Sequence, residues 1–496
     1  MDHRLTRGAG ILLPISSLPS PYGIGTFGKE AYKFVDQLKE AGQIYWQVLP
    51  IGPTSYGDSP YQSFSTFAGN PYFIDLDMLI EEGLLDKSTV NDIKWEELEY
   101  DIDYAKIYEN RYTVLRKAFL KSKERSEKEY KSFLEKNKYW IEDYSLYMAC
   151  KDHFENKEWL LWDEDIRLRK PEAVKHYSEL LKENIEFWKY VQYKFYSQWN
   201  ELKKYANDNG IKIIGDIPIY VALDSSDVWA NPSQYQLDGE LKPVDVAGCP
   251  PDAFSDYGQK WGNPLYDWDA MEKDDFSWWR KRMKAASGLY DIIRIDHFIG
   301  MAKYYAIPAD GVPVDGEYRL GPGVKLTKAI NESIGDAQII AEDLGVSMPE
   351  ARELLDASGY PGMKVLEFAF DGNRANEYLP HNYEKNCVVY SGTHDNETLI
   401  GYFDSLDKES FKFLKEYTGC HHKKNLADVI IKMAYQSVAD TAIIQMQDIL
   451  HKDNKSRMNL PSTIGQNWRW RMKKNEFKKE HIEKLYKLTD IYYRLK

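Results

Sequence analysis

Several short apolar runs in this chain end at a carboxylate or a histidine, and this pattern constrains the fold more than any other feature. Four of them occupy residues 213–216, 292–297, 339–343 and 388–396. Each apolar run has the length of a strand, is bounded by Gly or polar residues, and is followed by a helix-sized segment. Such runs are typical of buried parallel strands. In a (β/α)8 barrel, the carboxyl ends of these strands hold the chemistry.

The alternation of strands and helices predicts a parallel sheet covered by helices. Seven strand candidates lie at residues 45–50, 212–216, 291–296, 338–342, 364–370, 387–392 and 441–447. Helical patterns at residues 274–286 and 348–358 separate some of them. A further candidate at residues 71–76 completes eight strands. We therefore expect one α/β domain over residues 1–496, a (β/α)8 TIM barrel with large insertions.

Two stretches interrupt the strand–helix rhythm and predict insertions. Residues 80–210 are rich in Lys, Glu, Tyr and Trp and predict a mainly helical subdomain. Within it, the apolar positions from Ile185 to Trp199 fit one helix face, which indicates either a core-facing stripe or a platform for sugar rings. Residues 222–275, rich in Pro, Gly, Asp and Trp, predict ordered loops over the barrel mouth.

The composition favours a neutral partner. A net charge of −13 argues against nucleic acid and against an anionic membrane surface. The 14 Trp and 37 Tyr residues lean towards carbohydrate, because sugar rings stack on aromatic faces. The four cysteines lie far apart without a CxxC pair, and no export signal or membrane-length apolar stretch occurs. We expect a cytoplasmic protein with free thiols.

Residues 23–28 read GIGTFG and match the G-x-G-x-x-G pattern of dinucleotide-binding loops. That pattern requires a strand before it, whereas PISSLPSP precedes it here. A nucleotide cofactor is therefore disfavoured.

Arg294 and Asp296 lie two residues apart in a predicted strand, so both side chains point to the same face. An arginine beside the carboxylate would hold it ionised, as a nucleophile requires. A purely structural ion pair at a strand end explains the same pattern. Two carboxylates converging at one barrel mouth are the minimum equipment for glycoside chemistry.

Glu342 ends the next apolar run, and a closed apolar pocket near another carboxylate would raise its pKa enough for it to donate a proton near neutrality. A surface glutamate at a strand–loop junction is the alternative. His394 and Asp395 end the following run and fit either a grip on vicinal sugar hydroxyls or an ordinary turn capped by Asn396. The ordered set of such strand ends favours the catalytic interpretation.

The strand ends IIGDIPIYV, DIIRIDHF, IIAEDLG and VVYSGTHDN resemble, in that order, the four sequence blocks of α-amylase-type barrels. GDSPYQSFSTFAGNP, CPPDAFSDYGQKWGNPLY and NWRWR narrow the match. Together they are similar to the amylomaltases, or disproportionating enzymes, which are 4-α-glucanotransferases. The likeness spans essentially the whole chain and includes the glycines of residues 23–28.

The resemblance implies a retaining mechanism. Asp296 would be the nucleophile, Glu342 the general acid and base, and Asp395 the third carboxylate, gripping the ring hydroxyls of the bound glucose. Arg294 would orient Asp296. The other implied substrate contacts are His297, His394, Asp216, Tyr61, Trp261, Gln259 and Asp371, with Tyr56 and Asn467 as candidate outer glucan contacts.

The implied substrates are maltooligosaccharides and α-1,4-glucans such as starch, glycogen and amylose. No cofactor is expected, and no metal, because His297 and His394 show no zinc-binding spacing and no calcium loop occurs. Transfer prevails over hydrolysis only where the acceptor is bound and water is excluded. Residues 249–266 and 57–71 are the expected lid. An α-glucan hydrolase and a non-catalytic glucan-binding barrel are the rival interpretations, and the sequence predicts no oligomeric state.

Overall fold

Eight parallel strands form the central sheet of the protein. The computed structural model describes residues 3–55, 57–122, 128–251, 257–345 and 348–495. The strands are β1 (Gly8–Leu12), β2 (Tyr45–Gln47), β3 (Lys212–Pro218), β6 (Ile292–Asp296), β9 (Gln338–Ala341), β10 (Gly362–Val365), β11 (Cys387–Tyr390) and β12 (Thr441–Gln445). They pair in the order β10-β11-β12-β1-β2-β3-β6-β9.

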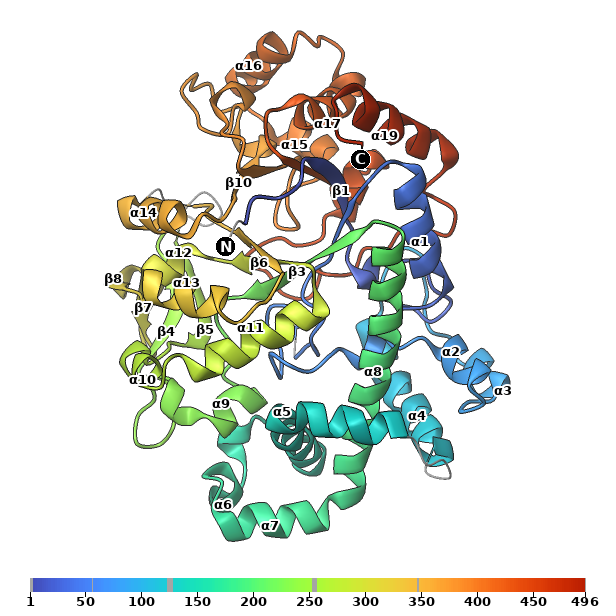
Figure 1. Cartoon of the computed structure of the whole chain (residues 1–496), viewed down its shortest axis with the longest axis vertical. Coiled ribbons are helices and arrows are strands. Elements are labelled where there is room, and N and C mark those ends of the chain that lie inside the picture. The colour runs from blue at the N-terminus through green and yellow to red at the C-terminus, as the bar shows by residue number, and fades with distance from the viewer. Residues whose placement is uncertain (1–2, 56, 123–127, 252–256, 346–347, 496) are drawn as a thin grey trace.

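The two ends of this sheet meet, which closes the barrel. The Ala341 N–H at the end of β9 donates to the carbonyl of Pro361, just before β10, at 3.0 Å. Helices including α1 (Lys29–Glu40), α8 (Lys182–Asp208) and α11 (Ser277–Leu289) cover the outside (Figure 1). Parallel strands buried on both faces need largely apolar sequences, and most of these strands have them. The predicted (β/α)8 barrel is confirmed.

The prediction of a strand at residues 71–76 is wrong. Pro71–Phe73 is a 3-10 helix that Asn70 caps by accepting the Tyr72 N–H, and α2 (Leu76–Glu81) follows. Proline lacks the N–H that a central strand must donate. The missing strand is β1, which contains two glycines and therefore gives a weak strand signal. A Cβ on Gly10 would lie 2.4 Å from the Tyr45 carbonyl oxygen, so close strand packing requires glycine there.

Other predicted elements agree with the structure more closely. The helix expected at residues 274–286 is α11, displaced by three residues, and the helix expected at 348–358 is α14 (Pro349–Ser358). The strand expected at residues 364–370 ends earlier, because β10 stops at Val365 and Leu366–Phe368 is a 3-10 helix. That early stop places the following residues at the mouth of the barrel.

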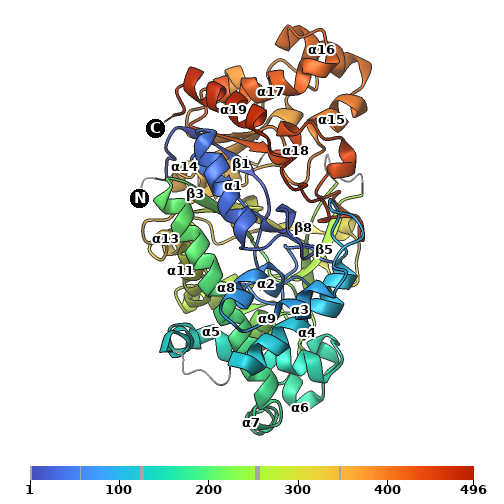
Figure 2. The ribbon, with the colours of Figure 1, turned by 90° about the vertical axis from the view of Figure 1, so that its right-hand side faces the viewer.

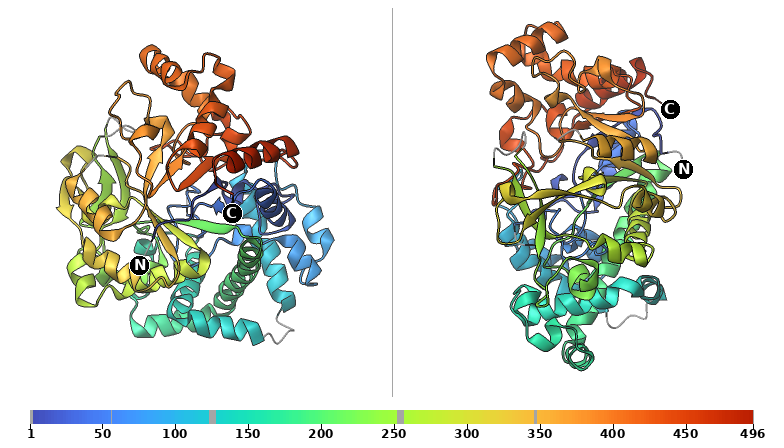
Figure 3. Two further views of the ribbon diagram at one scale, coloured as in Figure 1. Left: turned by 45° about the horizontal axis from the view of Figure 1, so that its top comes forward. Right: turned by 90° about the vertical axis from the view of Figure 1, so that its left-hand side faces the viewer.

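Residues 80–210 contain long helices that form one end of the molecule. They include α4 (Tyr104–Ser122), α5 (Lys128–His153), α7 (Pro171–Leu180) and α8. In Figures 2 and 3 these helices lie opposite the C-terminal helices, among them α16 (Lys408–Thr418) and α19 (Lys479–Ile491). The apolar stripe of α8 is core: Phe195 and Trp199 are fully buried against Phe27. The sugar-platform interpretation of this stripe is wrong.

Residues 222–275 contain strands that the sequence pattern did not predict. Here β4 (Asp245–Cys249) and β5 (Gln259–Pro264) pair in an antiparallel sheet with β7 (Lys303–Pro308) and β8 (Glu317–Leu320), in the order β5-β4-β7-β8. The short helix α12 (Ile299–Ala302) connects the end of β6 to β7 of this small sheet (Figure 1). The small sheet carries Trp261 to the carboxyl end of the barrel, where the indole meets His297. Among the described helices, none is both long and apolar enough to cross a membrane.

Candidate active site

The carboxyl ends of four barrel strands bring four carboxylates to one mouth, which we call the carboxylate cluster. Asp216 lies within β3 and Asp296 ends β6, while Glu342 and Asp395 follow β9 and β11. The strand order makes β3, β6 and β9 direct neighbours. Parallel strands align their carboxyl ends, so residues far apart in the sequence meet here.

Arg294 bridges two members of the carboxylate cluster. Its Nη1 lies 2.8 and 2.7 Å from the two carboxylate oxygens of Asp216 and 2.8 Å from Oδ1 of Asp296. The Arg294 and Asp216 side chains are 3% and 0% exposed, whereas Asp296 is 27% exposed. A buried charge must be paired to be tolerated, and here one guanidinium serves two carboxylates. Of these three ion-paired side chains, Asp296 is the one with an accessible face towards the mouth.

Glu342 is buried beside this ion-paired group. Its Oε2 accepts the His297 N–H at 2.6 Å, and its Oε1 accepts the Leu344 N–H at 2.9 Å. Burial raises the pKa of Glu342 to about 8, the charge of Asp296 adds to this rise, and Arg294 opposes it. A carboxyl group with such a pKa holds its proton at neutral pH. The alternative of an ordinary surface glutamate is wrong.

His394 and Tyr61 form a stacked pair on the other side of the mouth. Their rings lie 5.0 Å apart at an interplanar angle of 16°. The Tyr61 hydroxyl donates to Asp216 Oδ2 at 2.8 Å, which joins this pair to the carboxylate cluster. His394 Nε2 lies 3.4 Å from Oδ2 of Asp395. Direct contacts thus join six of the predicted residues, which come from β3, β6 and the segments that hold Tyr61 and His394. They are Asp216, Arg294, Asp296, Tyr61, His394 and Asp395.

A second aromatic group borders the mouth from the small antiparallel sheet. The Trp261 indole meets the His297 ring edge-on at 4.9 Å, and its Nε1 donates to Gln259 Oε1 at 3.1 Å. Gln62 donates to Asn263 of β5 at 3.1 Å. That bond joins the two segments expected to form a lid, residues 57–71 and 249–266. Residues 252–256 of the second segment lie outside the described part of the chain.

Two predicted substrate contacts within the described residues, Asp371 and Asn467, are not joined to this group. Asp371 is exposed and accepts the Asn373 N–H; within the described residues no hydrogen bond or ion pair links it to the carboxylate cluster. Asn467 closes its own loop by bonding the carbonyls of Leu460 and Thr463. Tyr56 lies outside the described residues.

Three residues of the site were not predicted from the sequence. Trp468 packs against both Tyr61 and His394, at 5.8 and 5.9 Å between ring centroids. Asn459 donates its amide to Asp395, and Arg457 donates to the carbonyl of the same residue. The NWRWR motif contains Trp468 and was the available signal for it. Asn459 and Arg457 follow no strand-end pattern, so nothing local marked them.

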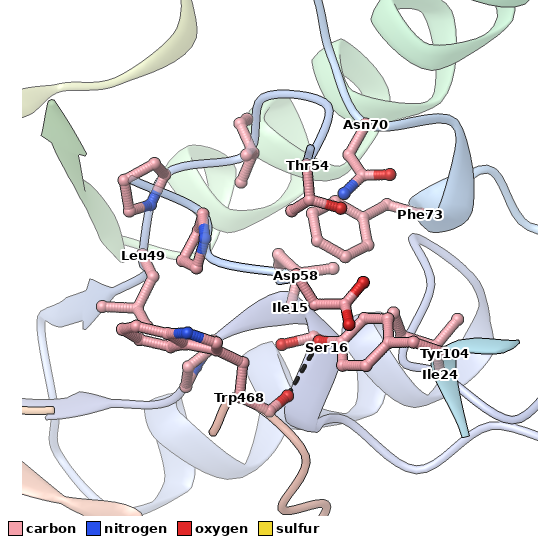
Figure 4. Close-up of a pocket in the computed structure, with 14 residues that line it drawn as sticks. Ile15, Ser16, Ile24, Leu49, Thr54, Asp58, Asn70, Phe73, Tyr104 and Trp468 are labelled. Atoms are coloured by element: carbon pink, nitrogen blue, oxygen red, sulfur yellow. Dashed lines mark hydrogen bonds between the residues drawn. The ribbon is translucent and has the colours of Figure 1, made fainter. Parts of the chain in front are cut away.

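Behind Trp468 lies a pocket that also contains Asp58, Tyr104 and Asn70 (Figure 4). Burial raises the pKa of Asp58 to about 6, and Arg469 opposes the rise. The Tyr104 hydroxyl donates to the Trp468 carbonyl at 2.8 Å, which holds the Trp468 backbone from this side. Among the described residues, no group of three or more His, Cys, Asp or Glu side chains is arranged to hold a metal ion.

Known proteins resemble this chain over nearly its full length. The family model described as 4-α-glucanotransferase matches residues 13–476. The 4-α-glucanotransferase of Clostridium butyricum is 50% identical over 481 residues, covering 96% of this chain and 99% of that protein. The 4-α-glucanotransferase of Streptococcus pneumoniae strain TIGR4 is 46% identical over 493 residues, covering 99% of this chain and 98% of that protein.

A solved structure agrees with these sequence matches. The amylomaltase from Streptococcus agalactiae, in complex with acarbose, superposes with a TM-score of 0.96 at 43% identity, covering 99% of this chain and 100% of that one. The family model covers the strand ends that carry Asp216, Asp296, Glu342 and Asp395. This chain therefore belongs to the 4-α-glucanotransferase family.

Proposed function

We propose that this 4-α-glucanotransferase moves α-1,4-glucan segments between maltooligosaccharides by a retaining double displacement at the carboxylate cluster. One observation carries the mechanism. Asp296 is paired with Arg294 and partly exposed, while Glu342 beside it is buried with a pKa of about 8. One group is therefore equipped to attack and the other to donate a proton, as retaining glycoside chemistry requires.

In the first step, a carboxylate oxygen of Asp296 bonds to the anomeric carbon as the glycosidic C–O bond breaks. Glu342 gives its proton to the departing oxygen, so the leaving glucan departs with a free 4-hydroxyl. In the second step, the ionised Glu342 takes the proton from the 4-hydroxyl of an acceptor glucan. That oxygen displaces Asp296 and restores an α-1,4 bond, and both carboxyl groups return to their starting forms.

The remaining members of the site bind the donor glucose in this proposal. Asp395 and His394 hold vicinal hydroxyls, and the Asp395 contact strengthens as the ring flattens towards the oxocarbenium-like transition state. Asp216 and His297 bind further hydroxyls. Tyr61 offers its ring face to the sugar, as aromatic residues commonly do. Arg294 positions Asp296 rather than touching the glucan.

Trp261 and Gln259 line the acceptor side, where they favour transfer over hydrolysis. An acceptor held in reacting geometry gains about 7–11 kcal/mol of effective proximity. The Gln62–Asn263 bond ties the two lid segments together, which supports a mouth from which water can be excluded. Asp371, Asn467 and Tyr56 are proposed outer glucan contacts.

The proposed substrates are maltooligosaccharides and α-1,4-glucans, including starch, glycogen and amylose. The amylomaltase from S. agalactiae supports this assignment, because its structure holds acarbose. A neutral substrate also suits a chain of net charge −13, which disfavours nucleic acid. In this proposal the enzyme works in the cytoplasm, and residues 1–496 act as one catalytic barrel with insertions at 80–210 and 222–275.

Incubation of the enzyme with maltotriose alone tests the proposal. We expect a ladder of longer glucans together with glucose or maltose, while the total number of reducing ends stays constant. A rise in reducing ends without longer products would identify a hydrolase instead. No change in maltotriose under conditions where it binds would identify a glucan-binding protein.

A further inference from the structure

Asp395 lies in a stretch without regular structure, so other segments must hold its carboxylate. The stretch runs from the end of β11 at Tyr390 to α15 (Leu399–Ser405). Its Asp395 side chain is 34% exposed, more than Asp216 or Asp296. A carboxylate that grips a reacting sugar must be positioned within a fraction of an ångström. Residues 457–459, which we call the clamp segment, supply these anchors.

The clamp segment donates hydrogen bonds to Asp395 and to its neighbour His394 from both backbone and side-chain groups. Asn459 Nδ2 donates to Asp395 Oδ1 at 2.6 Å, and the Asn459 N–H donates to the His394 carbonyl at 3.0 Å. Arg457 Nη2 donates to the Asp395 carbonyl at 2.6 Å, and its Nε donates to the Asn459 carbonyl at 2.8 Å. Three of these hydrogen bonds fix one short stretch against the other, and the fourth braces the clamp segment internally.

The clamp segment is itself held by contacts from Trp468 and from the segment after β12. Met458 is buried, its carbonyl accepts the Trp468 N–H at 2.7 Å, and the Trp468 ring packs against His394. Gln447 donates to the Ser456 carbonyl at 3.2 Å from the segment after β12. The clamp segment is therefore held on both sides, and its position is transmitted to Asp395.

The chemistry of the donor matters as well as its position. An amide N–H compensates a carboxylate oxygen without placing a full positive charge beside it. Asp296 has the opposite arrangement, because a guanidinium bonds it directly. Asn459 occupies Oδ1 of Asp395, and Oδ2 lies beside Nε2 of His394. Oδ2 and Nε2 together are then the pair of polar atoms that faces a sugar. The geometry points to Asn459 as a positioning residue that orients the Asp395 carboxylate towards the donor glucose. Arg457 holds both residues in place through its hydrogen bonds.

This inference rests on the proposed role of Asp395 in the reaction. Asn459→Ala keeps the backbone N–H that donates to His394 but removes the side-chain amide that donates to Asp395. The Asp395 carboxylate is then no longer held in its orientation. We expect kcat with maltotriose to fall about 10- to 100-fold, since small misplacements cost this much. KM should change little, because the grip of Asp395 matters most in the transition state.

Asn459→Asp gives a readout that a merely structural role would not move. It places a second carboxylate beside Asp395, where His394, Arg457 and Tyr61 are the other charged or titratable neighbours. Like charges resist simultaneous ionisation, so the acid limb of the pH–rate profile should move up by about one pH unit. Asn386→Ala is the matched control: this half-buried asparagine donates one bond, to the Gly359 carbonyl, just before β11. It should leave kcat and the acid limb unchanged.

Asp395→Asn distinguishes failure of the positioning role of Asn459 from failure of the proposed role of Asp395. If Asp395→Asn is inactive while both Asn459 variants keep wild-type kcat and pH profile, the positioning role is wrong and the proposed function stands. If Asp395→Asn retains activity, the proposed role of Asp395 fails, and the inference fails with it. Melting temperatures measured on every variant distinguish these results from loss of the fold.

Discussion

Glu342 Oε2 accepts the backbone N–H of His297 at 2.6 Å, which ties the carboxyl group after β9 to the residue after β6. The bond fixes the proposed proton donor against the strand that carries the proposed nucleophile. The His297 backbone has a φ of 53°, a left-handed conformation that few non-glycine residues adopt. Such conformations persist where the surrounding structure holds them, and they concentrate at functional sites.

The pKa of Glu342 predicts the alkaline limit of the reaction. Since the group must be protonated to act as an acid, kcat/KM should fall above pH 8, about tenfold per pH unit. Glu342→Gln should remove turnover of maltotriose. It should still react once with an α-maltosyl fluoride, whose leaving group needs no proton. If the reaction of Glu342→Gln with the fluoride still slows above pH 8, the alkaline limb belongs to another group.

Asp296→Asn should abolish turnover but leave the fold intact. Loss of the nucleophile is expected to lower kcat by about 10³-fold or more. The fold should persist because Arg294 keeps both contacts to Asp216. Maltotriose turnover and thermal unfolding, measured on the same preparation, check both halves. Activity near the wild-type level would remove Asp296 from the nucleophile role.

Trp261→Ala should damage transfer more than hydrolysis. The indole packs on His297 at the edge of the mouth, so its removal opens a path for water to the glycosyl-enzyme. The ratio of longer glucans to new reducing ends measures the effect. Trp268→Ala is the control, because Trp268 is half-buried in the same insertion but packs on Tyr266. Equal ratios in the two variants would contradict a water-excluding role for Trp261.

Glu367→Gln should stabilise the protein at neutral and alkaline pH. Burial raises the pKa of Glu367 well above 4.5, and Asp448 and Glu397 add to the rise. The unfolded chain ionises near the ordinary carboxyl value, so the wild-type free energy of unfolding should fall by about 1.4 kcal/mol per pH unit above it. This loss continues until the pH reaches the pKa of the folded state.

Glutamine is neutral at every pH, so Glu367→Gln should lack this slope in urea unfolding measured at a series of pH values. Glu353→Gln, on the exposed face of α14, is the matched substitution and should retain it. An identical pH dependence in Glu367→Gln and wild type would show that Glu367 is ionised in the folded protein.

The strand-end residues were predictable because a local pattern and a general rule agree on them. Apolar runs that end in Asp296, Glu342 and Asp395 are visible in the sequence, and parallel strands deliver their carboxyl ends to one mouth. β1 escaped prediction because it carries glycines, and Gly10 is required by close packing against Tyr45, a contact that no local pattern shows. Pro71 attracted a strand prediction because the run after it is apolar, although its missing N–H favours a helix start.

By itself, the sequence determined the barrel, the order of the strand ends that carry carboxylates and the types of residue at the mouth. Hydrophobic periodicity is a local property of the sequence, so it can be recognised without knowledge of the fold. Only the tertiary structure decided the protonation of Glu342 and the hold of Asn459 on Asp395, 64 residues away. Burial and long-range hydrogen bonds depend on which segments meet in space, and that is a property of the packed chain as a whole.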